Sequence, residues 1–279
     1  MITVGIDIGG STTKIAGLND GKIISPMLVK ANDPIASLFG AFGKFSSHNG
    51  LSFSEISCVV VTGVGASYVD KPIYGLPTAK SAEFLCNGLG GLYLTGLKQA
   101  LIVSMGTGTA FVRADEKNIS HMGGTAIGGG TIVGLSSRLL NIRDIGVLIK
   151  TAEGGDLKNV DLLVKDLTKD VLPTLPPELT ASNFGRLSEV ASNADIALGI
   201  FNLVFQSIGM SAVFSVMNTD IKDIIFIGNI TAVPYNREIF KTLGTLSGIN
   251  FIIPENAEYA TTIGAALSYN RGSDYTLLI

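Results

Sequence analysis

The chain of 279 residues contains no tryptophan, two histidines, two cysteines and few charged residues. Cys58 and Cys86 are too few for a disulfide framework, and the spacing of His48 and His121 does not fit a zinc site. The sequence has no basic run, and its formal net charge is -3, so we expect neither nucleic acid nor a membrane surface as a partner. The residues after Met1 lack a secretory n-region, which predicts a cytoplasmic protein.

Two common phosphate-binding motifs are also missing. The sequence contains neither the P-loop pattern Gly-x-x-x-x-Gly-Lys-Ser/Thr nor the dinucleotide pattern Gly-x-Gly-x-x-Gly. Hydrophobic residues make up 46% of the chain, which is enough to fill a large core. We therefore expect a globular protein that binds any nucleotide by another device.

One segment, residues 196–217, carries no charge and is as long as a bilayer span. Asn202 and Gln206 lie four residues apart within it, on one face of the predicted helix, and small residues accompany them. Polar side chains near the middle of a span are unfavourable in lipid. We therefore predict a core or subunit-interface helix, with no membrane partner.

The apolar periodicity predicts an α/β protein with two similar halves. The expected elements are strands at residues 2–7, 13–18 and 22–28, a helix around residues 35–45, a strand at 57–61, a helix at 81–97, a strand from 100 with a second hairpin, mainly helix from 180, a strand at 223–229 and a closing helix after 258. The order of three strands, a helix and a strand is that of an RNase H-like half. We place the boundary near residue 98, giving domains 1–98 and 99–279.

The first strand runs into a segment rich in glycine and hydroxyl groups. Asp7 places a carboxylate where it can bind Mg²⁺ through water, and Gly9 and Gly10 let backbone N–H groups approach anionic oxygens. A β-hairpin with a simple glycine turn is the alternative. The nucleotide-binding residues predicted in this first loop are Asp7, Ile8, Gly9, Gly10, Ser11, Thr12, Thr13 and Lys14.

The same arrangement occurs again at residues 101–112, where two apolar strands flank a Gly/Thr turn. The residues predicted to bind nucleotide in this second loop are Gly106, Thr107, Gly108 and Thr109. Two such loops can hold the phosphates of one nucleotide from opposite sides of a cleft. This plan resembles the actin-like ATPase and sugar-kinase superfamily, and the resemblance implies a two-domain fold with the nucleotide between its halves.

Two further segments, GGTAIGGGTIVGL at residues 123–135 and LTASNFG at 179–185, resemble type II pantothenate kinases. The resemblance implies ATP-dependent phosphorylation of pantothenate with Mg²⁺ as the metal. The first segment is a glycine nest that leads into a helix, whose free N–H groups suit an anion, although an ordinary helix start is the alternative. Its predicted nucleotide-binding residues are Gly129, Gly130, Thr131, Ile132 and Val133.

The resemblance also implies roles for residues that chemistry alone leaves open. Glu83 matches the carboxylate that takes the proton of the substrate hydroxyl, whereas without the resemblance it reads as a carboxylate stabilising a helix start. Gly228 and Asn229 match the segment that borders the adenosine. His121 stands where the family has an arginine that binds substrate or stabilises charge, and imidazole has a shorter reach and fewer donors than guanidinium.

Three hypotheses remain from the sequence. The leading one is a homodimeric pantothenate kinase that dimerises through the helix around residues 202–215. The second is a kinase of the same fold for another small hydroxylated substrate, such as an N-acetylhexosamine. The third is a non-catalytic nucleotide or acyl-CoA binding protein, or an ATPase that activates a partner enzyme; that last type usually carries cysteines for an iron–sulfur cluster, and Cys58 lies in a predicted buried strand.

Overall fold

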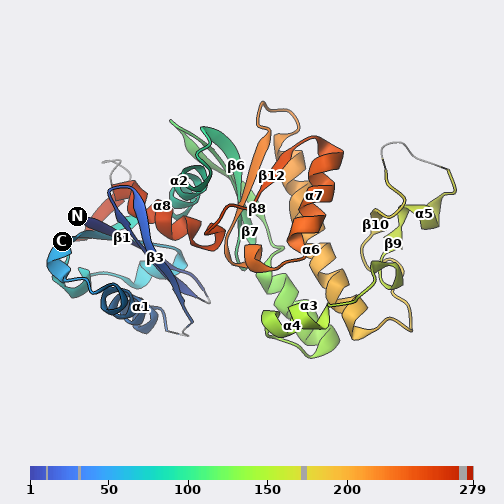
Figure 1. Cartoon of the computed structure of the whole chain (residues 1–279), viewed down its shortest axis with the longest axis horizontal. Coiled ribbons are helices and arrows are strands. Elements are labelled where there is room, and N and C mark those ends of the chain that lie inside the picture. The colour runs from blue at the N-terminus through green and yellow to red at the C-terminus, as the bar shows by residue number, and fades with distance from the viewer. Residues whose placement is uncertain (11, 31–32, 171–174, 270–274, 279) are drawn as a thin grey trace.

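The computed structural model describes residues 1–10, 12–30, 33–170, 175–269 and 275–278. The described chain forms two mixed β-sheets that lie beside each other, with helices on their faces and a small two-stranded arm at the far end (Figure 1). The predicted α/β class is therefore confirmed.

The first sheet has the strand order β13-β5-β4-β1-β2-β3. Its strands are β1 (Ile2–Ile8), β2 (Thr13–Asn19), β3 (Lys22–Val29), β4 (Ile56–Thr62), β5 (Thr78–Ser81) and β13 (Tyr275–Leu278). Alternate residues of β1 point to opposite faces. Val4 and Ile6 pack in the core that α1 (Pro34–Asn49) covers, whereas Gly5 lies against the backbone of α8 (Ala260–Ser268).

The second sheet has the order β12-β11-β6-β7-β8 and is also covered on both faces. Its strands are β6 (Gln99–Met105), β7 (Thr109–Asp115), β8 (Ile119–Thr125), β11 (Asp223–Ile227) and β12 (Asn250–Ile252). Leu101 and Val103 pack with α6 (Asn193–Val216), whereas Ala100 and Ile102 face the side of α2 (Glu83–Thr95). The remaining helices of more than one turn are α3 (Gly129–Leu140), α4 (Ile145–Thr151) and α7 (Asn236–Ser247).

The predicted strands and helices are confirmed, except that the helix expected from residue 180 begins only at Asn193. Six described strands were not predicted: β5, β8, β12, β13, β9 (Leu162–Leu163) and β10 (Thr180–Ser182). β8 contains the sequence Ile-Ser-His-Met-Gly-Gly-Thr, which has no apolar alternation, and it forms because it pairs with β7. β5 and β13 are short, and β13 pairs with β5 as the edge strand of the first sheet. Pairing partners distant in sequence decide such strands, so local periodicity does not reveal them.

The chain passes from the first sheet to the second between β5 and β6. The boundary predicted near residue 98 lies between these two strands. The last segments return to the first sheet, because α8 packs on β1 and β13 pairs with β5. The two halves are thus connected by α2 on the way out and by α8 on the way back. The division into domains at residue 98 stays a prediction.

Helices α2 and α8 cross at close range between the two sheets, and glycines make this approach possible. A Cβ atom added at Gly90 would overlap the carbonyl oxygen of Ala260, and one added at Gly264 would overlap that of Cys86. Gly40 of α1, in contrast, has no neighbouring atom within 4 Å of an added Cβ.

We expect Gly90→Ala to lower the thermal unfolding midpoint, because the helices must move apart at a cost of about 1–3 kcal/mol. The matched control Gly40→Ala should stabilise by about 0.5–1 kcal/mol, since alanine loses less backbone entropy in a helix. Differential scanning calorimetry of both variants measures the two shifts. Equal behaviour of the two variants would contradict the close crossing.

Among the described residues, α6 is the one helix long and apolar enough to cross a membrane, and 61% of its apolar window is buried inside the protein. Two polar side chains of α6 form hydrogen bonds with other segments of the chain. Asn202 donates to the buried carboxylate of Asp161 at 2.7 Å, and Asn183 donates to Gln206 at 3.1 Å. These bonds hold the arm of β9 (Leu162–Leu163) and β10 (Thr180–Ser182) against α6, so the helix is part of the core, as predicted.

Candidate nucleotide and substrate site

A cleft of about 390 Å³ lies between the two sheets and brings the two predicted loops together. Residues from both halves of the chain line it: Asp7, Gly9, Gly10, Thr12, Lys14, Val64, Glu83, Ser104, Gly106, Thr107, Gly108, Thr109, Ala110, Thr125, Gly228, Asn229 and Thr261. Twelve of these were predicted as site residues, although they come from four separate stretches of the chain. The cleft is therefore the candidate site.

The first loop is a tight connection between β1 and β2. The Gly9 N–H donates to the Thr12 carbonyl at 3.0 Å, which folds the loop back on itself. Ile8 and Thr13 are buried and do not line the cleft, so they act as supports of the loop. Thr13 accepts a hydrogen bond from Ser37 of α1. The predicted residue Ser11 lies outside the described residues.

The second loop is braced by the start of α3. The N–H groups of Gly129 and Gly130 donate to the carbonyls of Gly106 and Thr107, at 2.8 and 2.9 Å. The sequence predicted that these amides are free for an anion; they are instead occupied in holding the second loop. Thr131, Ile132 and Val133 do not line the cleft, so a direct role of this segment in nucleotide binding stays a prediction.

Asn229 connects the two halves across the cleft. Its Nδ2 donates to Thr12 Oγ1 at 3.2 Å, while its Oδ1 is buried without a hydrogen-bond partner among the described residues. A buried carbonyl oxygen that lacks a donor costs free energy, so it favours a ligand that brings an O–H or N–H group. Gly228 has φ 100° and lies against the Met105 backbone, where a side chain would not fit.

Three charged groups gather at one end of the cleft. Lys14 pairs with Asp7 across β1 and β2, and its Nζ lies 3.9 Å from the Asp7 carboxylate. Burial raises the pKa of Asp7, and the Lys14 charge partly opposes this shift. Burial, and then the Asp7 charge, raise the pKa of Glu83, again with Lys14 opposing. Glu83 is thus a partly desolvated carboxylate of increased basicity, as a proton acceptor requires.

The donor set fits a magnesium ion that arrives with a nucleotide. No group of three or more His, Cys, Asp or Glu side chains among the described residues is close enough to hold a metal by itself. Mg²⁺ usually takes one or two protein carboxylates and completes its shell with water and phosphate oxygens. Asp7 provides such a carboxylate beside the two loops, and its role as metal ligand stays a prediction.

His121 does not line the cleft, but its side chain contacts Phe84, the neighbour of Glu83 in the chain. Its imidazole stacks on the ring of Phe84, with ring centroids 3.8 Å apart and planes inclined by 3°. Phe84 is the residue after Glu83 in the first turn of α2. The structure therefore places His121 against the residue that follows the predicted base, and its catalytic role stays a prediction.

Several cleft residues were missed by sequence reasoning. Two of them are threonines, Thr125 at the end of β8 and Thr261 of α8. Thr261 donates to Asn87 Oδ1 at 2.7 Å, and Asn87 lies one turn after Glu83 on α2. A threonine inside an apolar helix is no local signal of a site, since such residues often face their own backbone.

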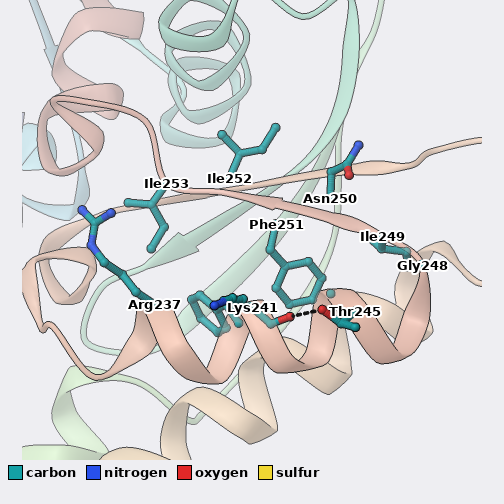
Figure 2. Close-up of a pocket in the computed structure, with 11 residues that line it drawn as sticks. Arg237, Lys241, Thr245, Gly248, Ile249, Asn250, Phe251, Ile252 and Ile253 are labelled. Carbon is teal, nitrogen blue, oxygen red and sulfur yellow. Dashed lines mark hydrogen bonds between the residues drawn. The ribbon is translucent and has the colours of Figure 1, made fainter. Parts of the chain in front are cut away.

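A second and larger hollow, of about 800 Å³, lies between α7 and β12 at the edge of the second sheet (Figure 2). Arg237 and Lys241 of α7 lie along it, and Phe251 of β12 points toward the helix. It contains no carboxylate and none of the predicted site residues. It therefore offers no proton acceptor or metal ligand for phosphoryl transfer.

Comparison with known proteins supports both the fold and the family. The activator of the 2-hydroxyisocaproyl-CoA dehydratase from Clostridium difficile, solved with bound ADPNP, superposes with a TM-score of 0.69 at 18% identity over 96% of this chain and 94% of that chain. A ROK family glucokinase from Streptomyces griseus, in complex with glucose and AMPPNP, has a TM-score of 0.63 at 13% identity over 98% and 100% of the two chains. The predicted actin-like ATPase fold is confirmed.

Sequence relatives narrow the assignment. A type II pantothenate kinase of Staphylococcus epidermidis is 27% identical over 94% of this chain and 98% of its own length. One of Bacillus cereus is 28% identical over 81% of this chain and 83% of its own. The sequence profile described as Fumble matches residues 98–248, more than half of the chain. Because the profile matches more than half of the chain and these relatives align over 81–94% of it, this chain belongs to the Fumble family, the family of the type II pantothenate kinases.

Proposed function

We propose that this protein is an ATP-dependent kinase that phosphorylates the primary hydroxyl of pantothenate. The observation that carries the proposal is the cleft itself, where two glycine loops, Asp7 and the basic carboxylate of Glu83 meet. The relatives named above are type II pantothenate kinases, and fold neighbours were solved with ATP analogues. We place the reaction in the cytoplasm, as the sequence predicts, and the apolar helix α6 is mostly buried inside the protein.

We propose a task for each part of the cleft. The N–H groups of Gly9 and Gly106 are bonded within their own loops, so the phosphates would be bound by the other backbone N–H groups and the threonine hydroxyls of the two loops. Asn229 Oδ1 is available for a donor of the nucleoside. Bound through Asp7, Mg²⁺ would neutralise phosphate charge. Glu83 accepts the proton of the substrate hydroxyl as the oxygen bonds to the γ-phosphorus, and ADP leaves. Most of the catalysis then comes from positioning and charge.

We expect purified protein with ATP, Mg²⁺ and pantothenate to produce phosphopantothenate, which mass spectrometry detects. Omitting Mg²⁺ or adding a chelator should abolish the product, because the terminal phosphates then lose their counter-charge. Pantetheine and N-acetylhexosamines, tested in parallel, cover the other substrates of the same fold. A protein that binds ATP yet phosphorylates only a hexosamine would overturn the proposal.

The alternative of a partner-activating ATPase has one structural neighbour in its favour, since the dehydratase activator shares the fold. The thiols argue against it. Cys58 and Cys86 are both fully buried in one apolar cluster, and burial raises the pKa of each thiol to about 11. Thiolates bind metals and clusters, so neither cysteine of this chain is available to a cluster at a subunit surface.

We further propose that the protein is a homodimer through α6. Asn202, at one end of the helix segment predicted as the interface, is occupied inside the chain. Five of the partly or fully exposed positions at this end of α6, however, follow the alternating spacing of four and three residues that is typical of a helix–helix seam. They are Leu203, Ser207, Met210, Phe214 and Met217.

We expect Phe214→Glu to shift the protein from dimer to monomer in light scattering at micromolar concentration. The Phe214 side chain is 64% exposed in the single chain, and burying a carboxylate in its place would be costly. Tyr68→Glu is the matched control, because Tyr68 is 66% exposed on the first half of the chain. A wild-type protein that is already monomeric would remove the dimer proposal.

A further inference from the structure

The contact between His121 and Phe84 joins the two halves of the protein beside the reacting end of the cleft. His121 belongs to β8 of the second sheet, and Phe84 belongs to α2 directly after Glu83. The rings lie parallel, with a centroid separation of 3.8 Å. Both side chains are exposed, so no surrounding core forces them together.

Stacking is the interaction that orients this imidazole. Within the described residues, the His121 side chain forms no hydrogen bond and no ion pair. The strand around it is irregular, since the register between β7 and β8 shifts next to the residue that faces His121. An exposed side chain on such a strand would sample several rotamers unless a contact selected one.

Charge near the stack is compatible with a cationic imidazole. The elements that pack most closely against β8 are β7 and α2. Their charged residues are Glu83 on α2, and Arg113 and Asp115 on β7. The π face of an aromatic ring attracts a cation placed over it. Phe84 thus offers both a fixed geometry and a favourable environment for a charged imidazole one residue from the base.

We propose that Phe84 is a positioning residue, which holds the His121 imidazole by stacking beside Glu83 and so orients it toward the substrate. This inference rests on the proposed kinase function. Phe84 itself need not touch the substrate. Its effect passes through His121, which predicts that the two residues are energetically coupled.

The first test is spectroscopic and does not depend on activity. The chain has two histidines, so His48→Gln identifies the His121 ring signals in a proton–carbon NMR spectrum. A proton above an aromatic ring is shifted upfield, and Phe84→Leu should abolish this shift for His121. Phe39→Leu is the matched control, because Phe39 and Phe84 are each 37% exposed and Phe39 also contacts another ring. An unchanged His121 signal in Phe84→Leu overturns the inference.

The second test is kinetic. Phe84→Leu should lower kcat/KM for pantothenate about two- to five-fold, the factor that corresponds to an exposed cation–π contact, and leave KM for ATP unchanged. In a His121→Ala background the same substitution should have no further effect. Equal losses in both backgrounds would show a merely structural role and overturn the inference. An inactive wild-type protein would overturn the proposed function alone, and the NMR comparison would then decide the inference.

Discussion

Glu83→Gln is expected to lower turnover about 10²–10⁴-fold while ATP binding is retained, because glutamine keeps the shape of the side chain but accepts no proton. Glu83 lines the cleft with both loops, so loss of the base affects the chemical step and leaves the phosphate contacts in place. Single-turnover kinetics and calorimetric ATP titration measure the two quantities separately. Turnover near that of wild type would make Glu83 a structural helix-start carboxylate.

The same substitution should change the pH dependence. The raised pKa of Glu83 places the acidic limb of kcat/KM above the range of an ordinary glutamate, and activity is lost as the pH falls through it.

A carboxyl group with a raised pKa stabilises the folded state below its unfolded pKa and loses this contribution as the pH rises. Glu83→Gln should therefore raise the unfolding temperature at neutral pH. The exposed Glu189→Gln is the control and should change neither quantity.

His121→Arg is expected to strengthen pantothenate binding by about 1–3 kcal/mol, if the new guanidinium makes a charge-assisted hydrogen bond to the substrate. Arginine can also stack on Phe84, as the imidazole does. An imidazole gains charge as the pH falls, whereas a guanidinium is charged throughout. The permanent charge of the arginine should therefore lower KM for pantothenate throughout the pH range in which Glu83 is deprotonated.

The other histidine gives the control for this experiment. His48 is exposed near the end of α1, and His48→Arg should leave affinity and pH profile unchanged. Steady-state kinetics for pantothenate across pH, with ATP saturating, compare the three proteins. If His121→Arg behaves like His48→Arg, the imidazole has no part in binding, and another cation must contact the substrate.

Much of the fold was predictable because its signals are local. The strand–glycine–strand pattern around Gly9 and Gly106 predicted both loops, and apolar periodicity predicted β1, β4, α1 and α6 within a few residues. β8 was missed because a strand with two glycines forms only through its partner β7. The hydrogen bond of Asn183 was also not predicted, since its acceptor, the Asp161 carboxylate, lies 22 residues away in sequence.

By itself, then, the sequence determined the two glycine loops, because these depend on residue type and short spacing, and its resemblance to a known family indicated that family and Glu83 as the candidate base. Only the tertiary structure decided how they act together. It paired Lys14 with Asp7 and placed both near Glu83, which sets the pKa of that carboxyl group through burial and charge. It also engaged the amides of Gly129 and Gly130 in bracing a loop, and stacked His121 on Phe84. Burial, charge proximity and ring contacts depend on distances between segments remote in sequence, which no local pattern contains.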